Sequence, residues 1–138
     1  MTNSTFLMVI GLNPSTADET QDDPTVRLCI GYAKRWGFGA LCMTNIFAWR
    51  ETSPDIMKAQ PAPVGIDNDA WLKFWASRAG LILGAWGIDG AHLGRGVEVV
   101  RLLNSHGLQC LGTTKSGHPW HPLYKSKNLR PQKFTLPR

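Results

Sequence analysis

Short apolar runs alternate with amphipathic stretches along this chain, and the alternation predicts strands that are separated by helices. Each apolar run has the length of a buried parallel strand. The predicted strands cover residues 5–11, 40–47, 81–86 and 108–112. Between them, apolar positions recur at helical spacing. One predicted helix begins at Asp23-Pro24, one begins at Asp67 and one covers 94–106, with Gly37, Gly80 and Gly107 as their stops.

Helices that connect successive strands imply a parallel sheet covered on both faces, with right-handed crossovers. We therefore expect an α/β fold of three layers, α/β/α, around a four-stranded parallel sheet. Residues 1–138 fit a single domain, since the length leaves little room for a second one. Residues 49–65 show no clear periodicity and are expected to form a loop. Residues 113–138 are expected to be loop and tail.

The basic residues in excess are concentrated at the C-terminal end. The whole chain has a net charge of +5, whereas residues 1–112 alone carry −1. Residues 113–138 contain six basic and no acidic residues. Such a segment attracts phosphates, although it can equally be a solvated tail. If it binds nucleic acid, the contacts are expected from Lys115, Lys125, Lys127 and Arg130.

Several classes of protein are disfavoured by the composition. No apolar run approaches the roughly 20 residues of a membrane span, and the first residues do not resemble a signal peptide. The three cysteines are widely spaced and form no CxxC, as in a reduced, cytoplasmic protein. His118 and His121 could form a metal pair, but no acid or cysteine is near them in sequence. We expect no metal, no organic cofactor, no membrane partner and a monomer.

Polar and aromatic groups follow every predicted strand. Because the carboxyl ends of parallel strands meet at one edge, these groups are expected to converge on a ligand site there. Each has an ordinary alternative: Asn13-Pro14-Ser15 is also turn chemistry, Asn45 can tie down a loop, and Trp86 can be a core residue. The predicted substrate-binding residues are Gly11, Leu12, Pro14, Ser15, Asn45, Phe47, Trp49, Arg50 and Trp86.

The sequence GLNPSTAD followed by GHPWHPLY is similar to an uncharacterised bacterial and phage domain family along most of the chain. More distantly, the order of motifs resembles the uracil-DNA glycosylase superfamily. The motifs that resemble it are Gly11-Leu12-Asn13-Pro14, Asn45, Trp86-Gly87 and His118-Pro119-Trp120-His121-Pro122-Leu123. The last motif has one residue more than in that superfamily, so either His118 or His121 can take the place of its histidine.

This resemblance implies a uracil-DNA glycosylase-like fold and a hydrolase that excises uracil or a modified or mismatched pyrimidine from DNA or a nucleotide. It implies that Asn13 positions the attacking water, with Asp18 as a candidate general base. Asn45 would read the base edge while Phe47 or Trp49 stacks on its face. His118 or His121 would stabilise charge on the departing base.

Two other functions are compatible with the same residues. The protein can be a nucleic-acid or nucleotide binding module that keeps the pocket without the chemistry, since Asn is a weaker water activator than Asp at position 13. It can also be an enzyme that uses this edge of the sheet on a small phosphorylated metabolite.

Overall fold

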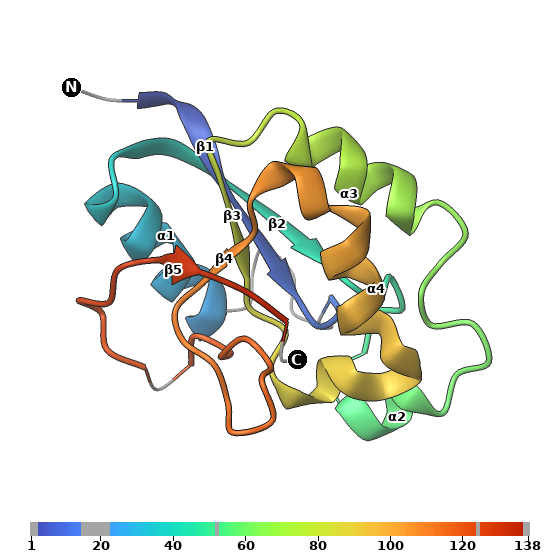
Figure 1. The fold of residues 1–138 in the computed structure, drawn as a ribbon. Coiled ribbons are helices and arrows are strands. Elements are labelled where there is room, and N and C mark those ends of the chain that lie inside the picture. Colours follow the sequence, from blue (N-terminus) through green and yellow to red (C-terminus); the bar gives the residue numbers. More distant parts are fainter. Residues whose placement is uncertain (1–2, 15–22, 52, 124, 137–138) are drawn as a thin grey trace.

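The computed structural model describes residues 3–14, 23–51, 53–123 and 125–136, which form one sheet with helices on both faces (Figure 1). The strand order is β2-β1-β3-β4-β5. Four strands run parallel: β1 (Asn3–Gly11), β2 (Phe38–Asn45), β3 (Leu81–Gly84) and β4 (Gln109–Cys110). The predicted α/β class is therefore confirmed, and each apolar run contains a strand.

A fifth strand, β5 (Gln132–Lys133), corrects the prediction of a four-stranded, fully parallel sheet, because it pairs antiparallel with β4. Phe134, directly after it, is buried with its ring centroid 6.2 Å from that of Trp86. The Phe134 N–H also donates to the carbonyl of Leu108 at 3.1 Å. Burial of this ring holds the basic segment on the edge of the sheet. A two-residue strand has no periodicity of its own, so the sequence pattern did not predict it.

One helix covers one face of the sheet and three cover the other (Figure 1). The single helix is α1 (Pro24–Arg35), and the opposite face carries α2 (Pro54–Lys58), α3 (Asn68–Ala76) and α4 (Arg95–Leu102). Two 3-10 segments, η1 (Ile88–Gly94) and η2 (Asn104–His106), flank α4. Of the four α-helices in the described residues, α2 alone was not predicted, because five residues are too few to show an amphipathic pattern.

The ends of α1 follow the predicted capping chemistry. Asp23 is its N-cap, and the carboxylate Oδ1 accepts the N–H groups of Thr25 at 2.9 Å and Val26 at 3.2 Å. Gly37, just beyond the last turn, has a φ of +85°, a conformation that glycine adopts without steric penalty. Gly107 ends η2 in the same way, with a φ of +72°.

Alternate residues of β1 belong to two separate cores. Leu7 and Val9 pack on the α1 side, in a cluster that includes Tyr32. Met8 and Ile10 pack on the side of α2, α3 and α4. Burial on both faces explains why β1 is continuously apolar rather than alternating. It also fixes the end of β1, and with it the loop that follows, in the middle of the sheet.

Candidate functional site

The strand order reverses at β1, and we call the edge of the sheet around the carboxyl ends of β1, β2 and β3 the crevice, after the usual place of ligands in such sheets. From β1 the chain passes through α1 to β2 on one side, and then through α2 and α3 to β3 on the other side. In open α/β sheets, ligands bind in the crevice at such a point. The segments that border it here begin at Gly11 of β1, Asn45 of β2 and Gly84 of β3.

Asn13, two residues beyond β1, holds two loops together. Its Nδ2 donates to the carbonyl of Trp49 at 3.0 Å and to that of Glu51 at 2.7 Å. The Glu51 N–H in turn donates to the carbonyl of Pro14 at 2.9 Å. The amide nitrogen of Asn13 thus fixes the loop after β2. Its Oδ1 accepts no hydrogen bond from a described residue and is the atom left for a water or a ligand.

Asn45 is the last residue of β2 and lies opposite Gly11 of β1. Its Oδ1 would be 3.0 Å from a β-carbon on Gly11, so glycine at that position leaves room for the amide. The Asn45 backbone carbonyl accepts a hydrogen bond from Nδ2 of Asn68 at 2.9 Å. Within the described part of the chain, the half-buried side-chain amide has no hydrogen-bond partner. It can therefore both donate to and accept from a ligand.

The aromatic candidates differ in their exposure. Phe47 is 0% and Trp86 is 2% exposed, and both belong to the core beneath the sheet edge. Trp86 packs so closely on η1 that a β-carbon on Gly90 would lie 2.0 Å from its Cδ1. Trp49 is 45% exposed, and Arg50 beside it is exposed as well. Of these rings, Trp49 is the one that a ligand can reach.

His118 lies in a tight turn after β4 and is half-buried. Thr113 and Pro119 form an antiparallel bridge across this turn. The Thr114 N–H donates to the His118 carbonyl at 2.8 Å, and the His118 N–H donates to Oγ1 of Thr114 at 3.1 Å. Gly117 supplies the left-handed conformation, with a φ of +87°. These bonds fix the backbone of His118 and involve neither ring nitrogen.

His121 lies against the end of β3. Its Cβ is 3.6 Å from the position that a β-carbon on Gly87 would occupy. The preceding residues are fixed on both sides, because Gly87 N–H donates to the Pro119 carbonyl at 3.0 Å and Trp120 N–H donates to the Gly112 carbonyl at 2.8 Å. His121 is therefore held beside the carboxyl end of β3, at the border of the crevice.

The residue His121 is exposed, but the protein still displaces part of the water around its imidazole. Protein atoms that displace water around the ring lower its pKa from the ordinary value of 6.5, and the negative charge of Asp23 opposes this. The Leu123 N–H donates to Nδ1 of His121 at 3.1 Å. An Nδ1 that accepts carries no proton, so Nε2 carries it in the neutral ring. His121, which keeps contact with solvent, can thus donate a hydrogen bond without carrying charge.

Two residues that support the site were missed by sequence reasoning, and one of them is Arg95. Arg95 is 1% exposed, its Nε donates to the Ile46 carbonyl at 2.7 Å, and its guanidinium pairs with Asp69 at 2.6 Å and with Glu98. It thereby supports the loop directly after Asn45. The signal that could have found it is its place between two glycines at the start of a helix. The other residue is Asp23, whose negative charge acts on the His121 ring. The sequence identified Asp23 only as a helix cap.

The predicted nucleic-acid contacts lie on a segment that is folded onto the protein. Lys115 and Lys127 are exposed, and Nζ of Lys125 lies 4.4 Å from the ring centroid of Trp120. Arg130 is exposed and lies further along the chain, toward β5.

The predicted site residues Ser15 and Asp18 lie outside the described residues. Leu12 is partly buried and packs against the core, and Pro14 is half-buried.

The thiols do not supply a nucleophile. Burial raises the pKa of Cys29 to about 12, with the charge of Asp23 acting in the same direction. Burial also raises the pKa of Cys42 and of Cys110. All three thiols therefore stay protonated at neutral pH.

In the described ranges, no three histidine, cysteine or acidic side chains gather as a metal site would need. The helices of those ranges include none that is long and apolar enough to cross a membrane.

A family model described as "Protein of unknown function (DUF1643)" matches residues 1–123. The expected similarity to an uncharacterised domain family is therefore confirmed. The match extends from β1 to Leu123 and so includes every segment that borders the crevice. No curated protein and no solved structure matches the chain. The more distant resemblance to the uracil-DNA glycosylases remains a prediction.

Proposed function

The chain belongs to a family of unknown function, DUF1643, and from the chemistry of its crevice we propose that it is a base-excising N-glycosylase. Its substrate would be uracil or a modified or mismatched pyrimidine in DNA or a nucleotide. The observation that carries the proposal is a pair of groups beside the crevice: the Asn45 amide, which has no partner among the described residues, and the His121 ring, whose Nδ1 accepts from Leu123 and so leaves Nε2 as the donor. A pyrimidine edge needs such an amide, and a departing base needs such a donor.

In the proposed reaction, the bond between the sugar C1′ and the base nitrogen breaks, and the oxygen of a water bonds to C1′. The electron pair of the broken bond passes to the base, whose charge collects on its carbonyl oxygens. Nε2–H of His121 would donate to that developing oxyanion, and a neutral donor does so without having to give up a proton. The base leaves as an anion and takes up a proton from solvent.

The attacking water would be held by Oδ1 of Asn13, since the amide nitrogen already bonds to loop carbonyls. The proton released by this water needs an acceptor, and Asp18, outside the described residues, is the candidate general base. Trp49 would stack on the base, as the exposed aromatic beside the crevice. Asn45 would then donate to and accept from the edge of the stacked base.

The fold supports a uracil-DNA glycosylase-like assignment through the placement of the motifs. Gly11 to Pro14, Asn45, Trp86-Gly87 and the segment from His118 to Leu123 all follow carboxyl ends of parallel strands. Each of the four motifs that resemble that superfamily thus lies at or after the carboxyl end of a parallel strand, which supports the proposal. Phosphates of the substrate would be attracted by the basic segment that begins at Lys115.

A second candidate function is a binding module for nucleic acid or nucleotides with the same pocket and no chemistry. One observation favours it: the amide nitrogen of Asn13 bonds to loop carbonyls, as expected of a residue that stabilises the loop. This candidate predicts affinity that falls linearly in log salt, together with no base release.

The test is base release from oligonucleotides that contain uracil, hydroxymethyluracil, mismatched thymine or hypoxanthine. The glycosylase proposal predicts release of one of the pyrimidines by the wild-type protein and loss of that release in an Asn13→Ala, Asn45→Ala double variant. Full activity of the double variant contradicts it. Tight, salt-dependent binding without release supports the binding module instead. Neither release nor binding of oligonucleotides points to a small phosphorylated metabolite.

A further inference from the structure

A second pocket lies at the opposite, amino end of the strands. It has a volume of about 610 Å³ and lies between the C-terminal end of α1 and the segment that leads into β5. Phe38 and Leu81, which line it, are the first residues of β2 and β3, so the pocket is separate from the crevice at the carboxyl ends. Its volume is within the range of about 300–1,000 Å³ that is typical of small-molecule sites.

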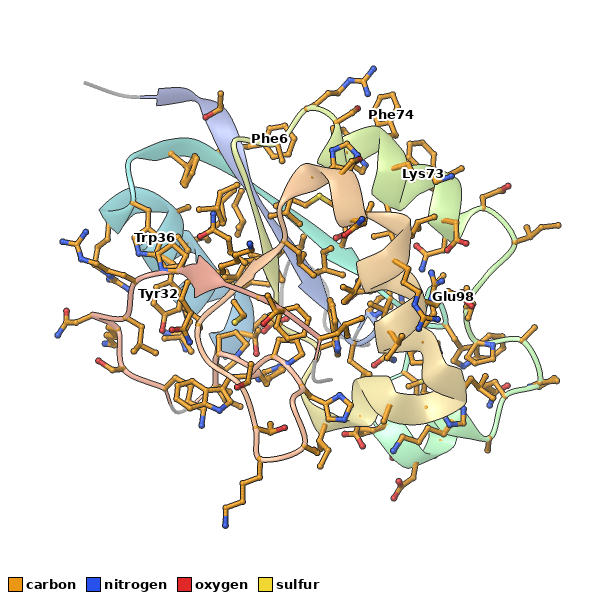
Figure 2. All side chains as sticks on the ribbon, viewed as in Figure 1. Phe6, Tyr32, Trp36, Lys73, Phe74 and Glu98 are labelled. Atoms are coloured by element: carbon orange, nitrogen blue, oxygen red, sulfur yellow. The ribbon has the colours of Figure 1, made fainter. Side chains whose placement is uncertain are left out.

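The wall of this pocket is held in place by side chains of α1. Nε1 of Trp36 donates to the Leu129 carbonyl at 3.2 Å, and the Tyr32 hydroxyl donates to the Ser126 carbonyl at 2.5 Å. The rings of Tyr32, in the last turns of α1, and Trp36, directly after it, stack with centroids 5.1 Å apart, and Figure 2 shows the two side by side. The segment from Ser126 to Leu129 is thus anchored at two points beside the pocket.

The charge of the pocket is positive. Arg35 and Arg130 line it, and no acidic residue is among its lining residues. Neither guanidinium pairs with a carboxylate of the described chain. Arg35 lies 5.1 Å from the centroid of the Tyr32 ring. The helix dipole favours a cation such as Arg35 in the last turn of α1. The dipole does not account for Arg130, which comes from a different segment.

We propose that this pocket binds a nucleoside monophosphate. Two arginines among the lining residues suit a phosphate, because a guanidinium donates several hydrogen bonds to phosphate oxygens. Trp36 and Phe38 are half-buried and present apolar surface for a flat ring. Asn128 supplies a side-chain amide that bonds to no other described residue and can reach a polar ring edge.

The proposal is independent of the glycosylase proposal. The two sites lie at opposite ends of the strands and share no residue. Asn128 and Arg130 also lie beyond residue 123, where the family match ends. An adenine nucleotide therefore tests this pocket with little interference, because the crevice is proposed to accept pyrimidines.

The experiment is calorimetric titration of the full chain with adenosine 5′-monophosphate, adenosine and inorganic phosphate. We expect one molecule of the monophosphate to bind, and adenosine and phosphate to bind at least tenfold more weakly. Arg35→Gln and Arg130→Gln should each weaken binding of the monophosphate at least tenfold. Arg101→Gln, an exposed arginine on α4 across the sheet, is the matched control and should leave binding unchanged.

Three results would overturn the proposal. The first is no binding of the monophosphate at millimolar concentration. The second is equal weakening, or none, in the two pocket variants and the Arg101→Gln control. The third is binding of phosphate or of adenosine as tight as that of the monophosphate. Thermal unfolding of each variant checks that all are folded, as expected for exposed side chains.

Discussion

The amide nitrogen of Asn13 lies 2.7 Å from the carbonyl oxygen of Glu51, and this hydrogen bond joins the end of β1 to the loop that follows β2. The same nitrogen also donates to the Trp49 carbonyl. Asn13 therefore has a structural role besides the water-positioning role proposed for it. An amide can serve both roles, whereas a carboxylate has no N–H to donate to the carbonyls.

Replacement of Asn13 by Asp is expected to destabilise the protein although Asp is the stronger water activator. The hydrogen bonds that Nδ2 donates to the carbonyls of Pro14, Trp49 and Glu51 are lost and a negative charge faces carbonyl oxygens, which should cost about 1–3 kcal/mol in the free energy of unfolding. Urea unfolding measures this. Asn104→Asp, at an exposed position in η2, is the control and should change stability by less than about 0.5 kcal/mol. Equal effects of the two substitutions would contradict the structural role.

The pKa of His121 should lie below 6.5 in the folded protein, because water around its ring is displaced. The Asp23→Asn variant should lower that pKa further, since it removes the opposing negative charge. Asparagine keeps the helix cap, so α1 should be unaffected. An NMR titration of the His121 ring measures both pKa values, and a pKa that rises in Asp23→Asn would show that this picture is wrong.

The lowered pKa of His121 also makes the free energy of unfolding depend on pH. The unfolded chain binds a proton at His121 more tightly than the folded chain does, because the folded-state pKa is the lower one. The contribution of His121 to stability is thus complete above pH 6.5 and is lost as the pH falls from 6.5 through the folded-state pKa. Urea unfolding of His121→Gln should lack this part of the pH dependence, and an unchanged pH profile would contradict it.

Gly90→Ala should destabilise the protein strongly, because a β-carbon there would lie 2.0 Å from Cδ1 of the buried Trp86 ring. Overpacking of this kind typically costs about 1–3 kcal/mol or more. Gly31→Ala is the matched control, since its β-carbon meets the flexible end of Arg35 at 3.2 Å within α1. That variant should be neutral or more stable by up to about 1 kcal/mol. Thermal unfolding should give a lower melting temperature for Gly90→Ala than for Gly31→Ala. The reverse order would contradict the close packing of Trp86 on Gly90.

Phe134→Ala should unfold the edge of the sheet around β5. Phe134 is buried against Trp86, and loss of a buried phenylalanine ring costs about 3–5 kcal/mol. Phe74→Ala, which removes a 41% exposed ring on α3, should cost far less. Hydrogen exchange at Gln132 and Lys133 follows β5 directly. Retained protection there in Phe134→Ala would show that other contacts hold the strand.

The sequence predicted the strand and helix order because apolar runs and capping residues are local signals. Asp23 and Gly37 bound α1 as expected. α2 and β5 were not predicted, since each is too short to have a period and forms through contacts distant in sequence. For β5 those contacts are made by Phe134 with Leu108 and Trp86.

For the candidate site, sequence order identified which residues follow the strands but not what each one contacts. Asn45 lies at the end of β2 and His121 beside Gly87, whereas Phe47 and Trp86 are buried in the core. The supporting role of Arg95 depends on Ile46 and Asp69, which are 49 and 26 positions away in the chain. Such contacts leave no pattern in a single sequence.

The most direct measurement is the single-turnover rate of base release from the best oligonucleotide, compared across Asn45→Ala, His121→Gln and Asn104→Ala. A catalytic crevice predicts a loss of at least tenfold in the first two variants, because one removes the contact to the base and the other replaces the donor to the departing base. Asn104→Ala, remote from the crevice, should keep the wild-type rate. Unchanged release in both crevice variants, or no release by the wild-type protein from any of the oligonucleotides, would contradict the proposed function.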